Sequence, residues 1–297
     1  MDKKVKLLIQ TFFLFIFTLL IFIFINNLFI NLSRIGFGIN FNWLLKSAGF
    51  NLAEYSLPYT PSNSYAWAIF IGWLNSLKVI LFSLILATTI GTVIAFARAS
   101  RNRLIVNISS LYITIIRQTP LLLQLMFWYF VGFLGIKENN LFLFQQFLNI
   151  SNQGIKFSTF TISSEFAALL FGLSVFTSAF IAEVIRGGIF SVPIGQWEAF
   201  RSLGITERKG LVKIIFPQAL PAIIPGLTSQ YLNLAKNSTL AIAVGYSDIY
   251  AINDTIINQT GRAIECFLIL LISFLLLNLL ITNIMEFINN LIIKSRR

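Results

Sequence analysis

The sequence predicts an all-α polytopic membrane protein with about six transmembrane helices. Hydrophobic residues make up 57% of the 297-residue chain and charged residues 11%, and the mean hydropathy is +0.81. Soluble domains carry about 25% charged residues, so these few charges cannot coat a soluble globule of this length. The apolar residues form continuous runs rather than alternating with polar ones, which disfavours a closed β-barrel and favours spanning helices.

Six segments have about the 20 mostly apolar residues that a helix needs to cross a bilayer. They are 7–30, 68–97, 108–134, 164–187, 218–245 and 264–291. The first follows a basic N-terminus, as in a signal peptide. It is long, however, and lacks a small-residue cleavage site, so we interpret it as an uncleaved span.

Two prolines suggest a boundary after the first span. Pro58 and Pro61 interrupt the chain near residue 65. We therefore expect an extra N-terminal transmembrane helix with its periplasmic loop over 1–65, followed by a five-helix core over 66–297.

The distribution of basic residues predicts the orientation. With a cytoplasmic N-terminus and alternating spans, fourteen basic residues lie towards the cytoplasm and six towards the outside. The opposite orientation reverses this bias, so the positive-inside rule favours cytoplasmic N- and C-termini. The six outer residues are Arg34, Lys46, Lys78, Lys137, Lys156 and Arg262.

Composition also excludes several kinds of site. The chain has no histidine, which excludes His-based metal sites, triads and proton relays. Its single cysteine, Cys266, lies in an apolar run, so an intramolecular disulfide is impossible and a thiol enzyme is disfavoured. The net charge of +11 is compatible with nucleic-acid binding, but basic residues that flank apolar spans more often set topology. The 31 Phe residues fit a lipid-facing surface, or they reflect a genomic base bias.

The stretch between the fourth and fifth spans, 191–217, is the most informative. It reads SVPIGQWEAFRSLGITERKGLVKIIFP. A short helix is predicted over 196–203, which Gly204 can end in a left-handed conformation. A second helical piece begins at Thr206, a suitable N-cap, with Glu207 in its first turn. We expect a cytoplasmic helix–turn–helix elbow whose mixed apolar and charged surface suits docking to a soluble partner.

This elbow resembles the EAA loop of ABC importer permeases, whose signature is E-A-A, three residues, G, nine residues and I-x-L-P. The chain departs from it with Phe200 for the second Ala and Phe216 for the Leu, apolar changes that would adjust packing without removing the loop. The matching residues are Glu198, Ala199, Gly204, Ile214 and Pro217.

Other motifs resemble those of one subgroup. Residues 117–125, RQTPLLLQL, are similar to the R-x-x-P-L-L-x-Q motif of polar amino-acid permeases. The segments 228–240 (TSQYLNLAKNSTL) and 258–261 (NQTG) resemble the broad-specificity, general L-amino-acid permeases. The resemblance covers about 66–290 and leaves 1–65 outside.

The resemblance implies the type I ABC importer permease fold and a set of partners in a bacterial inner membrane. These are a second permease subunit in a homo- or heterodimer, an ABC ATPase dimer, a periplasmic amino-acid-binding protein and L-amino acids, with no nucleic acid. The chain lacks the phosphate-binding pattern G-x-x-x-x-G-K-[ST], so ATP and Mg²⁺ are expected on the partner ATPase, with no cofactor, metal or catalytic residue here. Closure of the ATPase would move the elbow and rock the fourth and fifth spans, giving alternating access.

Charges within spans are the first candidates for contact with a polar cargo, because each costs about 2.5–3.5 kcal/mol to insert. Arg117 and Lys236 could attract an α-carboxylate, and Glu183 could attract an α-ammonium group. Each has an alternative: Arg117 can extend to the inner headgroups, Glu183 can pair with Arg186, and Lys236 can hold two subunits together.

Uncharged polar residues within the spans complete the candidate path. Gln124, Asn237 and Ser238 could add hydrogen bonds to cargo or join neighbouring helices. Prolines within or beside spans can kink helices and expose carbonyl groups along a cavity, or serve no function. They are Pro120, Pro221 and Pro225.

Four alternative functions remain. A permease of the same fold for another polar solute is the main one. An ion-driven secondary transporter has less support, because the chain lacks histidine, has few buried carboxylates and would leave the elbow without a role. A membrane enzyme would need a cluster of reactive side chains that the sequence lacks. A structural anchor would not explain Lys236 or the elbow. A requirement for ATP and a soluble receptor separates the importer from the ion-driven transporter.

Overall fold

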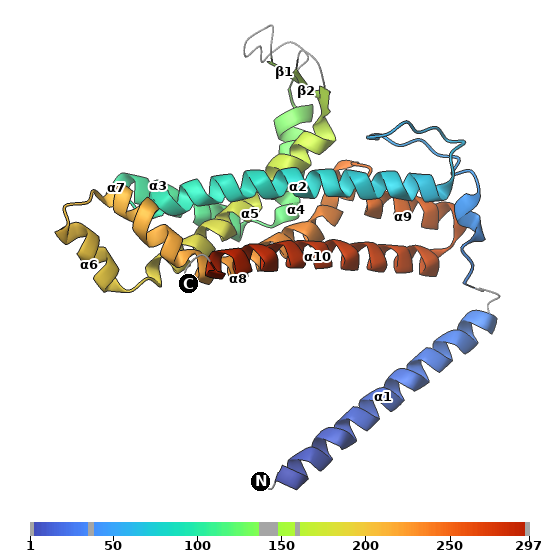
Figure 1. Cartoon of the computed structure of the whole chain (residues 1–297). Helices are drawn as coiled ribbons and strands as arrows, with labels where there is room; N and C mark the ends of the chain where they lie inside the picture. The colour runs from blue at the N-terminus through green and yellow to red at the C-terminus, as the bar shows by residue number, and fades with distance from the viewer. Residues whose placement is uncertain (1–2, 35–38, 137–147, 158–160, 295–297) are drawn as a thin grey trace. The chain divides into compact units, whose positions relative to one another are not determined.

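The computed structural model describes residues 3–34, 39–136, 148–157 and 161–294, in two compact units. The first unit, Met1–Trp43, contains α1 (Lys3–Arg34; Figure 1), and most of the described apolar side chains of this helix are exposed. This helix is long and apolar enough to cross a bilayer. Three of the basic residues that were counted to predict the orientation lie outside the described residues: Lys137, Arg296 and Arg297.

The second unit, Leu44–Arg297, consists mainly of long apolar helices. The longest are α2 (Tyr65–Arg98), α5 (Ser164–Phe190), α8 (Phe216–Asn237) and α10 (Ala263–Lys294). The shorter helical elements are η1 (Asn42–Leu45), α3 (Arg103–Gln118), α4 (Leu121–Met126), η2 (Phe127–Leu134), α6 (Ile194–Ser202), α7 (Glu207–Gly210), η3 (Leu211–Ile215), η4 (Ser238–Val244) and α9 (Ile249–Thr260). Including α1, five helical runs among the described residues are long and apolar enough to span a membrane.

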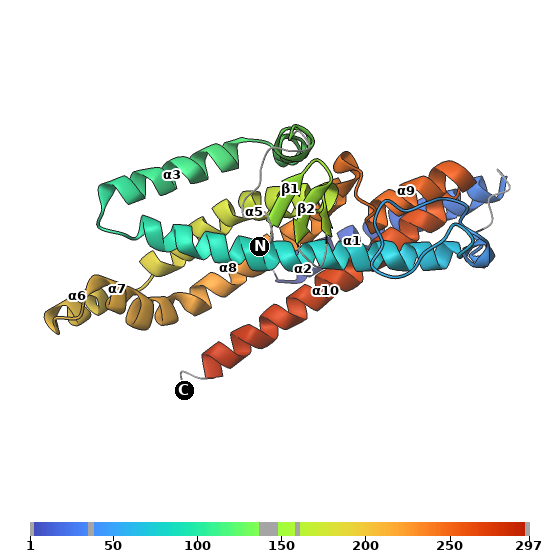
Figure 2. The ribbon, with the colours of Figure 1, turned by 90° about the horizontal axis from the view of Figure 1, so that it is seen from above.

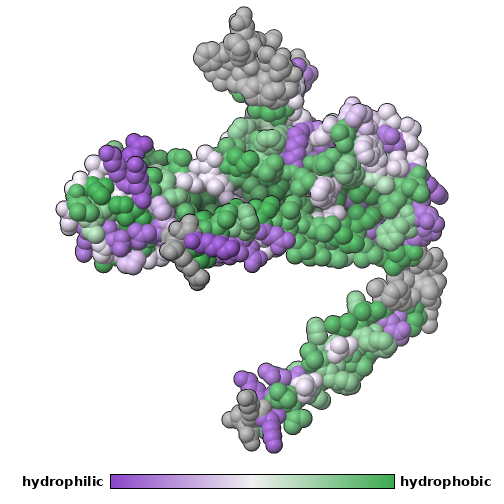
Figure 3. Space-filling model, viewed as in Figure 1, coloured by the Kyte–Doolittle hydropathy of each residue, from purple (hydrophilic) through white to green (hydrophobic). Residues whose placement is uncertain are grey.

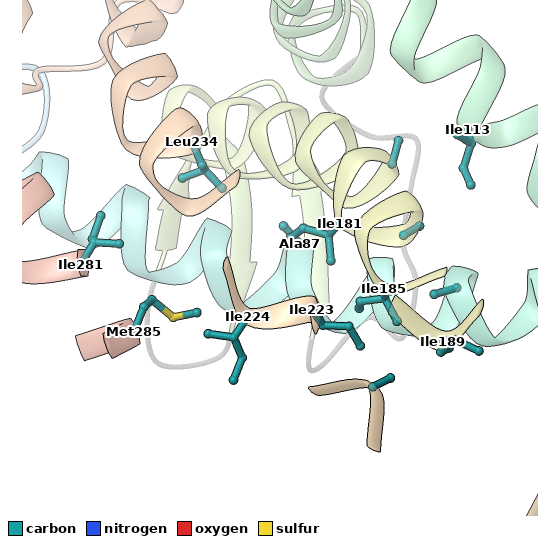
Figure 4. Close-up of a cluster of buried hydrophobic side chains, with 14 of the residues drawn as sticks. Ala87, Ile113, Ile181, Ile185, Ile189, Ile223, Ile224, Leu234, Ile281 and Met285 are labelled. Atoms are coloured by element: carbon teal, nitrogen blue, oxygen red, sulfur yellow. The ribbon is translucent and has the colours of Figure 1, made fainter. Parts of the chain in front are cut away.

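Helix α5 lies at the centre of the second unit and contacts α2, α3, α4 and α8 (Figure 2). Small residues allow α5 to lie close to α2 and α8. A Cβ atom at Gly188 would lie 2.3 Å from Ile223 of α8, and one at Gly91 of α2 would lie 2.7 Å from Ile181. This use of glycine is typical of helix packing in membranes. Figure 4 shows the resulting apolar cluster, which includes Ala87, Ile113, Ile181, Ile185, Ile223, Leu234 and Ile281.

The predicted third span, 108–134, is not one helix, and this expectation was wrong. Helix α3 ends at Gln118, Thr119 is extended, and α4 begins after Pro120. Proline has no backbone N–H and disfavours a helical conformation in the residue before it, so the helix stops there. The apolar segment that follows, Leu121–Leu134, is shorter than a full span and ends in the π-helical η2.

The fifth predicted span, 218–245, belongs to a longer helical run, Glu207–Val244. Pro221 and Pro225 lie inside α8, which continues through both. The π-helical η3 precedes Pro217 at the start of α8. Such a wide turn can accommodate a proline ring that would clash with the carbonyl four residues earlier in a regular helix.

Two segments between the predicted spans contain regular structure. The segment 246–262 contains α9, which follows the N-cap Asp248 and ends before Gly261, which is in a left-handed conformation. A three-stranded antiparallel sheet of β1 (Leu148–Ser151), β2 (Gly154–Phe157) and β3 (Thr161–Ser163) precedes α5. Short polar segments of this kind carry too weak a periodicity to be recognised alone.

Residues 44–64, which we had placed with the N-terminal region, belong to the second unit. Asn75 Nδ2 donates to the carbonyl oxygens of Glu54 at 3.0 Å and Ser247 at 2.8 Å. Lys78 forms an ion pair with Glu54 at 2.7 Å. The compact unit therefore begins about twenty residues before the predicted boundary at 65.

The surface of the second unit separates by polarity. Apolar side chains cover the face over the N-terminal half of α10 and the neighbouring part of α2, whereas hydrophilic side chains gather near α6 and α7 and over the C-terminal half of α10 (Figure 3). An apolar band along the long helices is the surface expected of a protein in contact with lipid.

Candidate functional site

The elbow between α5 and α8 has the predicted helix–turn–helix form. Gly204 follows α6 with φ of 69°. A Cβ atom there would meet nothing within 4 Å, so the left-handed backbone rather than lack of space favours glycine. Thr206 is the N-cap of α7, although its side chain makes no capping hydrogen bond.

Phe200 holds the two arms of the elbow together. Its side chain is 1% exposed, and a Cβ atom at Gly210 would lie 2.4 Å from its ring. The Phe at the second Ala position of the motif therefore fills the space that Gly210 leaves open. Sequence reasoning identified this residue as a departure and did not predict its packing role.

The elbow also presents an accessible surface. Glu198, Ala199 and Pro217 are exposed, Ile214 is half-buried, and the side chain of Leu203 is 77% exposed.

An ion-pair cluster ties the elbow to the turn between α2 and α3. Glu207 accepts hydrogen bonds from Arg201 Nε at 2.8 Å and from Arg101. The hydrogen bond from Arg201 lowers the pKa of Glu207, and the positive charge of Arg101 adds to that effect. Sequence reasoning missed this cluster because Arg101 and Glu207 are 106 residues apart.

Glu183 of α5 already has cationic partners. Its Oε1 accepts from Arg98, and its Oε2 accepts from Arg186 Nη2 at 2.9 Å and Nε at 3.1 Å. The side chain of Glu183 is 21% exposed. Of the two roles considered for it, the structure shows pairing with arginine.

Arg117 lies in the last turn of α3 and faces α5. Its guanidinium carbon is 5.0 Å from the centroid of the Phe180 ring, a cation–π distance. Beside it is a hollow of about 510 Å³, which Arg98, Glu183 and Arg186 also line.

Lys236 of α8 lines a second hollow, of about 260 Å³, between α5 and α8. Phe180 lines both hollows. Arg117, Glu183, Lys236 and Asn237 are therefore brought to adjoining hollows around one aromatic ring. The other residues lining the second hollow are Phe176, Thr177, Gln230 and Asn233.

Gln124 and Ser238 do not line either hollow. Gln124 Nε2 donates to the carbonyl oxygens of Ile116 at 2.9 Å and Thr119 at 3.0 Å, at the break before α4. The Ser238 hydroxyl is buried and donates to the carbonyl oxygen of Ala235 at 2.8 Å. These three hydrogen bonds satisfy carbonyl groups at helix ends, where regular helical partners are missing.

Curated proteins similar to this chain are permeases. It is 32% identical to the putative amino-acid ABC transporter permease YhdX of Escherichia coli, over 89% of this chain and 88% of that protein. It is also 32% identical to the general L-amino acid transport system permease AapQ of Rhizobium johnstonii, over 89% of this chain and 86% of that protein.

Two solved structures share the fold. The crystal structure of an amino acid ABC transporter with histidines matches with a TM-score of 0.59 and 28% identity, over 76% of this chain and 94% of that chain. The inward-facing methionine transporter MetNI matches with a TM-score of 0.59 and 20% identity, over 76% and 96%, and at that identity it supports the fold alone. The type I ABC importer permease fold is confirmed.

A family model matches residues 87–294, which include the elbow and the helices around both hollows. The chain belongs to the binding-protein-dependent transport system inner membrane component family, and it is a multi-pass permease subunit of an ABC importer.

Proposed function

We propose that this subunit moves L-amino acids across the bacterial inner membrane by alternating access, driven by an ABC ATPase dimer that binds the elbow. The observation that carries the proposal is the elbow itself. Its left-handed turn at Gly204 and the packing of Phe200 define its shape, while Glu198 and Leu203 remain exposed for a partner.

The elbow is attached to the moving parts in two ways. It connects α5 directly to the helical run that contains α8, and the Arg101–Glu207 pair links it to the turn after α2. A displacement of the elbow would therefore act on three long helices together, as rigid-body alternating access requires.

The remaining partners and the cargo follow from the family and its relatives. A second permease subunit would complete the path, a periplasmic binding protein would deliver the amino acid, and ATP with Mg²⁺ would bind to the ATPase. Amino-acid cargo is supported by relatives that are named for it. Cytoplasmic N- and C-termini are supported by the positive-inside charge bias.

Uptake into vesicles tests this proposal. The chain is reconstituted with the products of its neighbouring genes, and labelled mixed L-amino acids are added with and without internal ATP and external receptor. We expect uptake that requires both. Uptake driven by an ion gradient alone would contradict the coupling mechanism. An assembled, ATP-hydrolysing complex that carries other polar solutes but no amino acid would contradict the cargo.

A further inference from the structure

We propose that the path through this subunit favours dicarboxylic amino acids over neutral amino acids of the same size, because Arg117 and Lys236 present available positive charges in the two hollows that Phe180 lines. This inference rests on the proposed amino-acid transport and specifies the class of cargo. It concerns selection by the permease, which adds to any selection by the receptor.

The charges that line the two hollows are unequal. Four cationic side chains and one carboxylate line them. The cations are Arg98, Arg117, Arg186 and Lys236. Two of these, Arg98 and Arg186, are held by Glu183. The path therefore has an excess of positive charge around Phe180.

The carboxylate is not available to attract a cationic cargo. Both oxygens of Glu183 accept hydrogen bonds from guanidinium groups. An additional ammonium group would have to displace an arginine from a partly buried ion pair, which exposes an unpaired charge. A lysine or arginine side chain entering these hollows would instead meet the surplus of cations.

Arg117 and Lys236 are available to a carboxylate of the cargo, whereas Arg98 and Arg186 are paired with Glu183. Within the described ranges, neither forms an ion pair with a carboxylate of this chain. Arg117 rests over the Phe180 ring, and a guanidinium group stacked in this way can still donate N–H groups in its plane to a carboxylate. Lys236 can offer an ammonium group as a second, separate point of positive charge.

The neighbouring amides can hold the rest of the cargo. Gln230, Asn233 and Asn237 line the hollow with Lys236, and their carbonyl oxygens can accept hydrogen bonds from an α-ammonium group. A dicarboxylic amino acid has two anionic groups for the two cations and one ammonium group for the amides. A neutral amino acid of the same shape leaves one cation without a partner.

Glutamate and glutamine provide the sharpest comparison, because they have nearly the same size and differ in one charge. In the vesicle system, the ratio of glutamate to glutamine uptake is measured for the wild type, Lys236→Gln and Arg117→Gln. The same receptor supplies every variant, so its preference cancels when the ratios are compared. We expect about a tenfold fall in the ratio for each variant, since loss of one charge partner acts mainly on the anionic cargo.

Two controls separate charge from general damage. Lys236→Arg retains the positive charge and should keep most of the wild-type ratio. Lys294→Gln makes the same chemical change at the end of α10, where the side chain lines neither hollow, and should leave the ratio unchanged. Assembly with the ATPase is checked by co-purification for every variant.

Binding to the receptor-free permease–ATPase complex gives a second measurement that does not need uptake. Labelled glutamate should bind the wild-type complex about tenfold more tightly than glutamine, and Lys236→Gln should remove most of that difference. Equal binding of the two, or unchanged uptake ratios in both Gln variants, would overturn the inference and leave amino-acid transport standing. A wild-type complex that carries no amino acid would overturn the proposed function itself.

Discussion

At the scale of single residues, Gly204 illustrates how one backbone conformation shapes the elbow. Its φ of 69° is accessible to glycine without strain, whereas a residue with a Cβ atom pays about 1–2 kcal/mol for the left-handed region. The turn between α6 and α7 depends on this conformation, because the chain reverses there.

We therefore expect Gly204→Ala to weaken binding of the ATPase to the permease about 5–30-fold, which is the change in affinity that corresponds to a backbone strain of about 1–2 kcal/mol. Titration of purified ATPase onto permease in nanodiscs measures the change. Gly195→Ala is the matched control, since Gly195 also has nothing within 4 Å of an added Cβ but does not have positive φ. Equal affinities for the two variants would show that the turn does not control docking.

Gln124 performs a structural task at the break between α3 and α4. Its amide donates to the carbonyl oxygens of Ile116 and Thr119, which would otherwise lack partners there. We expect Gln124→Leu to reduce the free energy of unfolding by about 1–3 kcal/mol, the cost of leaving buried polar groups unsatisfied. Thermal unfolding in detergent measures this loss. Gln118→Leu alters an exposed amide nearby and should have a much smaller effect; an equal effect would reject the assigned role.

The buried carboxylate of Asp248, at the N-terminus of α9, should make this helix sensitive to pH. This carboxylate accepts the backbone N–H of Ala251 at 2.8 Å, and burial raises its pKa from 3.8 to about 7. The folded state therefore retains a proton that the unfolded chain releases between these two values. Stability linked to this group is fully present below about pH 4 and is lost as pH rises towards and through 7.

We expect hydrogen-exchange protection of α9, corrected for the intrinsic exchange rate, to be lower at pH 8 than at pH 5. Asp248→Asn should flatten this dependence, because its amide oxygen can still cap the helix but does not titrate. A pH dependence that persists in the Asn variant would assign the effect to another group.

At the scale of helices, α2 and α5 are joined by charge as well as by apolar packing. Arg98 of α2 and Glu183 of α5 form an ion pair 85 residues apart in the chain, and Arg186 adds a second contact to the same carboxylate. Removing Glu183 leaves two arginine charges without compensation, whereas removing Arg98 as well leaves only the charge of Arg186.

A double-mutant cycle measures this coupling. We expect Glu183→Met to lower the free energy of unfolding by about 1–3 kcal/mol, less than for a fully buried pair because the group is partly exposed. The Arg98→Met, Glu183→Met double variant should lose less than the sum of the two single variants. Denaturation of the complex in detergent gives the values, and strict additivity would show that the pair contributes no coupling.

At the scale of the whole molecule, the proposed orientation places the elbow and the C-terminal end of α10 in the cytoplasm, with the loop 44–64 and the β-sheet outside. Cys266, the one native cysteine, is buried and can be replaced by serine to give a background for labelling. Exposed positions then report which side of the membrane they occupy.

We expect a membrane-impermeant thiol reagent applied to intact cells to label Ser62→Cys and Gln153→Cys. Arg208→Cys and Lys294→Cys should react only after permeabilisation. The reverse pattern would contradict the positive-inside interpretation and with it the cytoplasmic elbow.

Much of this molecule could be predicted from local sequence. The long apolar runs and the elbow are each contained in a continuous segment, so composition, periodicity and residue spacing are sufficient to identify them. The third span was wrong where Pro120 ends a helix inside an apolar run, and α9 was missed because a 12-residue helix between two spans resembles a polar loop. In both cases, hydropathy averaged over a stretch of sequence does not reveal the residue at which the backbone conformation changes.

By itself, the sequence determined that this is a helical membrane protein with an ABC permease elbow. Tertiary structure alone decided the partners of the charged side chains: Arg98 with Glu183, Arg101 with Glu207, and Arg117 with the ring of Phe180. The physical reason is that burial in a membrane and turn formation depend on neighbouring residues in the chain. Compensation of charge depends instead on which distant helices pack together, and here the central helix α5 sets that arrangement.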